Sequence, residues 1–248
     1  MKALTVSNLQ KSFQSDFYKK PSQILKGVSF EIQQGRFVGL IGPNGAGKTT
    51  TIKCLMEFIF PDSGQIKFFE DSRILQSKSK IGFLPERPYF QEFLTGFEFL
   101  KMHWNLSGLK SNQFSQRAAE VLEKVKLSHA GDKRLKDYSK GMLQRIGIAQ
   151  ALLAFPEFLI LDEPMSGLDP DGRILIKDIL KSFKEQKITT LMSSHLLEDV
   201  EELCEDLIII HKGEVKYSGS IADFKKSYLN LEEAYRAFKL KFEVDLDV

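Results

Sequence analysis

The sequence has few cysteines and no long uninterrupted apolar run. Cys54 and Cys204 are the 2 cysteines in 248 residues, and each has a leucine beside it and other apolar residues nearby. This pattern favours buried free thiols over a disulfide or a metal site. The apolar stretch at residues 151–161 is broken by Pro156 and Glu157, well short of the roughly 20 residues that a membrane span needs. The sequence therefore predicts a chain that does not cross a bilayer.

Neither sign of charge dominates the sequence. The 35 Lys and Arg residues nearly balance the 33 Asp and Glu residues, and the two signs are intermixed. We therefore expect no broad basic surface for nucleic acid. Residues 1–13 alternate apolar and polar side chains, unlike the continuous apolar segment of a signal peptide, so a cytoplasmic protein is expected. With 42% hydrophobic residues the chain has ordinary globular composition.

The hydrophobic pattern predicts alternating strands and helices. Short apolar or alternating segments predict strands at residues 4–9, 28–32, 37–41, 158–161, 189–192 and 207–210. Helical spacing predicts helices from Lys48 until Pro61 and at residues 174–183, 196–203, 222–228 and 231–240. Lys212 and Gly213 predict a tight turn before a further strand at 214–217. The alternation indicates a parallel sheet covered by helices, and residues 90–154, which lack a strand signal, indicate a helical lobe.

A glycine-rich loop follows the strand predicted at 37–41. The spacing G-x-x-x-x-G-K-[ST] is matched by Gly42, Pro43, Asn44, Gly45, Ala46, Gly47, Lys48 and Thr49. The glycines let successive N–H groups converge on phosphate oxygens, and the start of the next helix adds partial positive charge. Lys48 is expected to reach the β and γ phosphates of a nucleotide, and Thr49 to offer its hydroxyl to Mg²⁺, with Thr50 beside it.

Two acids follow the strand predicted at 158–161. Asp162 and Glu163 are thereby placed at the carboxyl edge of a buried sheet, where open α/β folds bind ligands. Asp162 is expected to hold the metal, and Glu163 to polarise the attacking water as a general base. A strand that ends in solvated acids is the alternative. Together with the glycine loop, the pair predicts hydrolysis of a nucleoside triphosphate.

The segment LDEPMSGLDP at residues 161–170, with GPNGAGKTT at 42–50, resembles the nucleotide-binding domain of the ATP-binding cassette (ABC) family. The likeness extends over nearly the whole chain. It implies an α/β fold: a P-loop NTPase core with a mixed sheet and helices, an antiparallel β subdomain and an inserted α-helical lobe. The resemblance places the RecA-like core and β subdomain at about 1–89 and 155–220, the lobe at about 90–154 and C-terminal helices at about 221–248.

The resemblance also assigns roles outside the two ATP motifs. YSKGM at residues 138–142 lies where the family has its signature loop, so Ser139 and Gly141 are expected to face a nucleotide phosphate. Ser139 is also a predicted helix N-cap, a role that such a serine often has without any chemistry. Residues 166–169 resemble the D-loop, in which Asp169 joins the nucleotide contacts. His195 resembles the switch histidine, which with Lys48 and Glu163 would complete the catalytic group.

Four positions are ambiguous or depart from the family pattern. Phe13 lies where an aromatic ring stacks on adenine, although an ordinary edge-strand phenylalanine fits equally well. The lid glutamine is replaced within IGFLPE at 81–86, where Glu86 either contacts Mg²⁺ or water or is a surface acid. Lys140 and Met142 stand where the signature more commonly has Gly and Gln.

The resemblance implies partners as well. A complete site needs two cassettes, so we expect an ATP-dependent, head-to-tail dimer with a second copy or a related cassette. An integral-membrane permease is the other expected partner, which would hold the chain on the cytoplasmic face of the membrane, and no nucleic acid is expected. The signature variant SKGM and the segment LEEAY at 231–235 favour the exporter branch with a separate permease chain. A soluble ABC ATPase that acts on nucleic acid or ribosomes, and a regulator that hardly hydrolyses ATP, remain alternatives.

Overall fold

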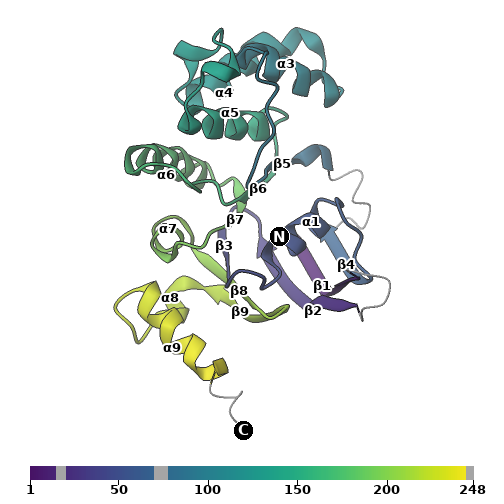
Figure 1. Cartoon of the computed structure of the whole chain (residues 1–248), viewed down its shortest axis with the longest axis vertical. Helices are drawn as coiled ribbons and strands as arrows, with labels where there is room; N and C mark the ends of the chain where they lie inside the picture. The colour runs from purple at the N-terminus through teal and green to yellow at the C-terminus, as the bar shows by residue number, and fades with distance from the viewer. Residues whose placement is uncertain (15–20, 70–77, 244–248) are drawn as a thin grey trace.

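The computed structural model describes residues 1–14, 21–69 and 78–243. Its strands form two sheets, which lie side by side in Figure 1. The smaller sheet has the order β2-β1-β4, from β2 (Ser22–Gln33), β1 (Lys2–Phe13) and β4 (Ser63–Phe68). The larger has the order β5-β6-β7-β3-β8-β9, from β5 (Ile81–Leu84), β6 (Phe158–Asp162), β7 (Thr189–Ser193), β3 (Phe37–Ile41), β8 (Asp206–His211) and β9 (Glu214–Ser220). In these ranges no helix has the length and apolarity of a membrane span.

The larger sheet is parallel from β5 to β8, and only β9 runs antiparallel, on β8. Every residue of β3, β6 and β7 is buried. Such strands read as continuous apolar runs because both faces of the sheet are covered. The predicted turn between β8 and β9 is confirmed, since Lys212 and Gly213 both have positive φ, 48° and 84°.

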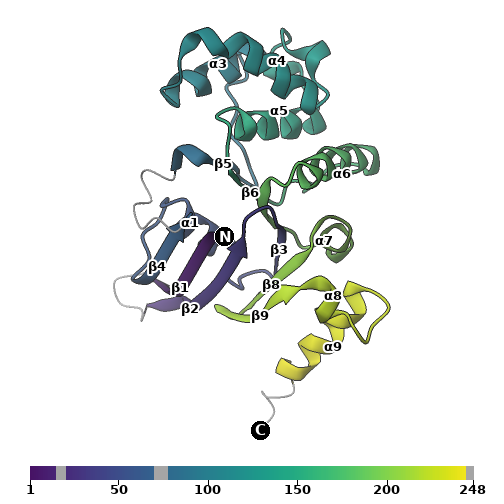
Figure 2. The ribbon, with the colours of Figure 1, turned by 180° about the vertical axis from the view of Figure 1, so that it is seen from behind.

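Helices cover both faces of this sheet. The helices of the described residues are α1 (Lys48–Leu55), α3 (Gly96–Leu106), α4 (Phe114–Lys124), α5 (Lys140–Leu152), α6 (Pro170–Glu185), α7 (Leu197–Leu203), α8 (Ile221–Phe224) and α9 (Leu231–Glu243). Of these, α1 packs on one face of the sheet, and α5, α6 and α7 pack on the other. Single 3₁₀ turns lie at Lys78–Lys80, Ser111–Gln113, Ser128–Ala130 and Leu135–Asp137. Helices α3, α4 and α5 gather at one end of the molecule, within the range predicted for a helical lobe (Figures 1 and 2). The residue bounds given above for the core, the lobe and the C-terminal helices remain a prediction.

Alternate residues of the central strands belong to two different cores. On one side, Leu159 and Leu161 of β6 pack with α5, α6 and α7. On the other, Phe158 and Ile160 pack with α1 and the antiparallel sheet. Because successive side chains of a strand point to opposite faces, one strand joins both layers. The predicted fold class, α/β with a mixed sheet, an antiparallel sheet and added helices, is confirmed.

Several details differ from the sequence-based expectation. Strand β2 begins at Ser22 and not at residue 28, and the helix predicted at 222–228 ends at Phe224. Helix α1 ends at Leu55 and not near Pro61, because Glu57 adopts a positive φ of 54°, which a helix cannot continue. Strands β4 and β5 were not predicted. β4 is a strand that buries only Ile66 and Phe68, and β5 has only four residues, so neither gives a strong local pattern.

Both cysteines are free and buried, as predicted. Cys54 lies on α1, and burial raises the pKa of its thiol to about 11. Burial also raises the pKa of the Cys204 thiol, which lies just after α7. A thiol with a raised pKa is a poor nucleophile, so neither cysteine contributes chemistry.

Candidate active site

The glycine-rich loop between β3 and α1 encloses the side chain of Lys48. Gly42 and Gly47 have φ of 153° and 110°. A Cβ at Gly42 would lie 2.1 Å from the carbonyl oxygen of Ile210, so this position requires glycine. The ammonium of Lys48 donates to the carbonyl oxygens of Gly42 at 2.7 Å and Pro43 at 3.3 Å. The loop thus holds a buried cation at its own mouth, where the predicted phosphates would bind.

Asp162 and Glu163 are positioned by the neighbouring strand β7. Ser193 ends this strand and pairs in parallel register with Asp162. The Ser193 hydroxyl donates to Oδ1 of Asp162 at 2.6 Å and accepts the backbone N–H of Glu163 at 2.9 Å. Glu163 has a positive φ of 51°, a conformation that is uncommon outside glycine and often occurs at functional sites. One hydroxyl therefore fixes both acids at the sheet edge.

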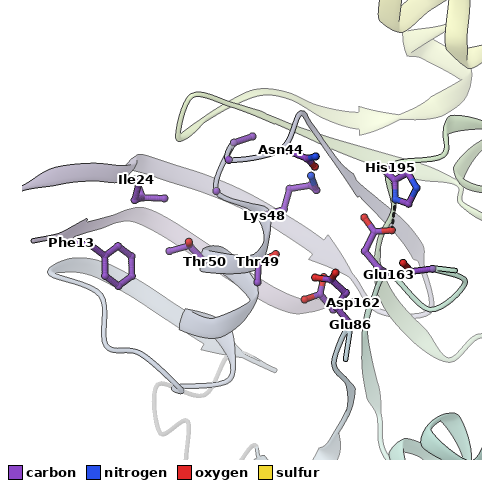
Figure 3. Close-up of a pocket in the computed structure, with 14 residues that line it drawn as sticks. Phe13, Ile24, Asn44, Lys48, Thr49, Thr50, Glu86, Asp162, Glu163 and His195 are labelled. Atoms are coloured by element: carbon purple, nitrogen blue, oxygen red, sulfur yellow. Dashed lines mark hydrogen bonds and ion pairs between the residues drawn. The ribbon is translucent and has the colours of Figure 1, made fainter. Parts of the chain in front are cut away.

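His195 lies in the loop that follows β7, opposite Glu163. Its Nδ1 is 2.7 Å from Oε2 of Glu163, the contact drawn as a dashed line in Figure 3. The side chain of His195 is 54% exposed, whereas that of Glu163 is only 14% exposed. A carboxylate that accepts from Nδ1 fixes the tautomer of the imidazole and leaves Nε2 for another partner. The pair can therefore bind a ligand through His195 while Glu163 stays shielded.

These segments line one cleft of about 550 Å³, shown in Figure 3. The structure brings together in it most of the predicted site residues: Phe13, Asn44, Gly45, Ala46, Gly47, Lys48, Thr49, Thr50, Glu86, Asp162, Glu163 and His195. Figure 3 places Phe13 with Ile24 at one end and His195 at the other. Gly42 and Pro43 instead line an adjacent cleft of about 260 Å³. Along the main cleft, the ring of Phe13 is followed by the glycine loop with Lys48 and then by the acids Asp162 and Glu163.

Residues 25–166 match the family model described as ABC transporter. The chain belongs to this family. It is 40% identical over 223 residues to the uncharacterized ABC transporter ATP-binding protein YxlF of Bacillus subtilis (strain 168), which covers 90% of this chain and 72% of YxlF. It is 38% identical over 203 residues to the linearmycin resistance ATP-binding protein LnrL of the same strain, which covers 81% of this chain and 65% of LnrL. The chain thus spans about two thirds of the length of these relatives.

The same cassette architecture occurs in solved structures. A structure of the ATP binding subunit of an ABC transporter matches with a TM-score of 0.83 at 29% sequence identity, and covers 96% of this chain and 99% of that one. The chain is therefore an ATP-binding cassette with an ATPase domain. The solved structure that it matches is described as an ATP-binding subunit with this fold.

Residues of the predicted signature loop and most residues of the predicted D-loop line a second cleft, of about 500 Å³. Ser139, Gly141 and Asp169 lie there and not in the cleft of Figure 3. The predicted cap is confirmed, because the Ser139 hydroxyl accepts a backbone N–H in the first turn of α5 at 3.3 Å. The side chain of Lys140 extends over Gly167, where a Cβ would lie 2.0 Å from its Nζ. The signature loop and the D-loop of one chain thus face one another.

The charges in the cleft of Figure 3 do not balance. Burial raises the pKa of Asp162, and the nearby carboxylates of Glu86 and Glu163 add to this rise, against the hydrogen bond from Ser193 and the charge of Lys48. Burial also lowers the pKa of Lys48, which the same three carboxylates oppose. Three acids therefore face one buried ammonium, an arrangement that favours the binding of a cation.

The donor atoms of this cleft fit magnesium. Thr49 offers a hydroxyl, and Asp162 and Glu86 offer carboxylates, and all three residues line the cleft. Within the described ranges, no group of three or more His, Cys, Asp and Glu side chains is arranged to hold a metal by itself. Mg²⁺ commonly binds through one or two carboxylates, water and substrate phosphates. The residues therefore fit an ion that binds together with the nucleotide.

Three residues that shape the site were not predicted from the sequence to do so. Ser193, the second residue before His195, contacts both acids. Ile24 of β2 and Ser166 of the D-loop also line the cleft without having been predicted to do so. The carboxyl ends of adjacent parallel strands meet at one sheet edge, so the predicted strand at 189–192 could have pointed to Ser193.

Proposed function

We propose that this chain is the ATP-hydrolysing subunit of an ABC exporter whose permease is a separate membrane protein. The observation that carries the hydrolytic role is the contact of 2.7 Å between His195 and Glu163, in the cleft that also holds Lys48. Membership of the ABC transporter family supports the transport role. The chain would act as a peripheral subunit on the cytoplasmic face of the membrane.

Different residues of the cleft would bind the nucleotide, hold Mg²⁺ and accept the proton of the attacking water. The loop N–H groups and Lys48 would bind the phosphates, and Phe13 would stack on the adenine. Glu163 would accept a proton from the attacking water, a contribution of roughly 10²- to 10⁴-fold in rate. His195 would hold the terminal phosphate and keep Glu163 in line. Thr49, Asp162 and Glu86 would hold Mg²⁺, which, when bound, neutralises charge on the phosphate oxygens.

A second cassette would complete the site. Ser139, Gly141 and Asp169 are predicted nucleotide contacts, yet in this chain they lie in a cleft apart from Lys48. A head-to-tail pair of copies, or a pair with a related cassette, would place these residues against the nucleotide of the partner. Because such a pair binds ATP fully only when closed, ATP would drive closure and hydrolysis would reverse it.

A groove between the helical lobe and β5 is the proposed docking surface for the permease. It has a volume of about 670 Å³ and is lined by lobe residues such as His103 and Leu153, by Phe83 of β5, and by Phe58 and Tyr89. Tyr89 is 84% exposed and Phe58 is 60% exposed. Lys78 and Arg87 also line it, and its lining residues in the described ranges include no Asp or Glu. Aromatic side chains with a basic rim suit a cytoplasmic segment that carries apolar and acidic residues.

The proposed direction of transport is export. The relative LnrL is a linearmycin resistance ATP-binding protein. Resistance through a transporter is most directly obtained by moving the compound outward. This relative and the signature variant SKGM support export for the present chain.

Copurification tests the proposal. The tagged chain, extracted from membranes in detergent, is expected to bring down a membrane protein with several spans and to hydrolyse MgATP. Recovery of ribosomes or DNA without a membrane protein would contradict the transport role. Absence of MgATP hydrolysis by the copurified complex would contradict the enzymatic role.

A further inference from the structure

A buried ion network joins the helix after the D-loop to the helix after the switch histidine. Asp199 of α7 is completely buried, with 0% of its surface exposed. A terminal nitrogen of Arg173, on α6, donates to both carboxylate oxygens of Asp199 at 2.9 Å each. The ammonium of Lys177, also on α6, lies 2.9 Å from Oδ1 of the same carboxylate. A buried charge is strongly unfavourable without partners, so these contacts fix α6 against α7.

Each end of the Arg173–Asp199 contact lies one helical turn from a predicted functional loop. The backbone N–H of Arg173 donates to the carbonyl oxygen of Asp169, the D-loop residue that caps α6. Asp199 lies in the first turn of α7, four residues after His195. Figures 1 and 2 both show α6 and α7 side by side next to β7. The ion pair therefore connects the two helices that directly follow these loops.

The Arg173–Asp199 contact also links the D-loop to the proposed catalytic pair, Glu163 and His195. His195 contacts Glu163 at 2.7 Å, and the backbone N–H of Ser166, which begins the D-loop, donates to the carbonyl oxygen of Glu163 at 3.0 Å. The D-loop then leads into α6 and, through Arg173 and Asp199, back to the helix that follows His195. A shift of the D-loop relative to the sheet is therefore carried to both members of the catalytic pair.

We infer that Arg173 and Asp199 are positioning residues, which keep the D-loop and His195 in a fixed relation during hydrolysis. This inference rests on the proposed function, because a second cassette would press on the D-loop. Lys177 lies a further turn along α6 and also pairs with Glu202, so it balances the charge of Asp199 without contacting the D-loop turn.

Matched substitutions of the two cations separate positioning from charge balance. R173Q and K177Q each remove one cation from Asp199 and leave the other at 2.9 Å. If the network only neutralises Asp199, both variants should affect turnover alike. If Arg173 positions the loops, R173Q alone should lower kcat, by about tenfold or more, since misplacement of about 1 Å can cost roughly 100-fold.

The measurements are kcat, KM for MgATP, the Kd for ATP and the melting temperature of the complex with its permease. Support requires that R173Q lowers kcat at unchanged Kd, and that K177Q keeps kcat within about twofold of the parent. Equal loss in both variants, or no loss in R173Q, overturns the inference. If R173Q does not fold, D199N, which keeps the side-chain volume, is compared with K177Q by the same criteria. Failure of both R173Q and D199N to fold would show a structural role and overturn the inference as well.

The parent protein distinguishes this inference from the proposed function. If the parent hydrolyses MgATP and R173Q behaves like K177Q, the positioning role is wrong and the proposed function stands. If the parent itself neither binds nor hydrolyses MgATP, the proposed function fails first. Binding of ATP by all variants, measured without turnover, shows that any loss of kcat concerns the catalytic step.

Discussion

Nδ1 of His195 lies 2.7 Å from Oε2 of Glu163, although the two residues are 32 positions apart in the chain. They meet because β6 and β7 are parallel neighbours, so the loops after both strands emerge at the same edge of the sheet. The same edge holds the glycine loop after β3, which pairs with β7 on its other side. The arrangement therefore follows from strand order, and it allows one ligand to contact three loops.

E163Q should retain ATP binding and lose turnover. The amide keeps the size of the side chain but cannot accept a proton from water, so the expected loss in kcat is about 10²- to 10⁴-fold. Phosphate release measures turnover, and titration calorimetry measures the Kd for ATP. E157Q is the matched control, because Glu157 precedes the same strand and only pairs with Lys80 on the surface, at 2.8 Å. Equal turnover in E163Q and E157Q would remove Glu163 from the role of base.

S193A should impair both stability and catalysis. The Ser193 hydroxyl is a partner of the Asp162 carboxylate and of the Glu163 N–H, both at the sheet edge. Its loss leaves buried polar groups without a protein partner, at a cost of about 1–3 kcal/mol in unfolding free energy. Denaturant titration measures this cost, and kcat should fall because Glu163 is no longer held.

S182A is the control for this prediction. The Ser182 hydroxyl donates to a carbonyl oxygen within its own helix, α6, at 2.7 Å, and it contacts no predicted site residue. S182A should therefore leave kcat unchanged. If S193A also keeps the parent kcat, Ser193 does not position the acids.

The sequence carries the local parts of the site, and the structure adds the parts that depend on distant pairing. The glycine loop and the acids after β6 were predictable because each is a continuous motif whose spacing alone implies phosphate and metal binding. Ser193 and the link from Arg173 to Asp199 were not, since each depends on which segments become neighbours. Strand β4 was missed for the same reason: it is stabilised by antiparallel pairing with β1 rather than by a strong apolar pattern of its own.

D162N should stabilise the chain in the absence of magnesium and nucleotide. Burial raises the pKa of Asp162, so the folded chain holds this proton more tightly than the unfolded chain. The stability that the protonated group contributes is present below the usual carboxyl pKa of about 4 and is lost as the pH rises through the raised value. At neutral pH the ionised Asp162 thus weakens the folded state, and a neutral amide should raise the melting temperature.

The same variant should lose the stabilisation that MgATP adds, because the amide is a weaker magnesium ligand than the carboxylate. Melting curves with and without MgATP, at neutral pH and near pH 4, test both effects, and the advantage of D162N should shrink at the lower pH. D178N, on the exposed face of α6, is the control with an equal change of charge. A lower melting temperature of D162N without ligand would contradict the proposed charge imbalance.

Y89A should weaken the association with the permease and leave ATP binding unchanged. Tyr89 is 84% exposed and lines the groove between the lobe and β5, whereas the ATP cleft is lined by other residues. Exposed aromatic side chains often carry much of an interface, and their truncation commonly costs about 2 kcal/mol or more in binding. F93A is the control, because Phe93 is 70% exposed and does not line this groove. Both variants are extracted from membranes and compared by the amount of permease that copurifies and by the Kd for ATP. Reduced recovery with Y89A alone supports docking in the groove, while equal recovery with both variants places the permease on another surface.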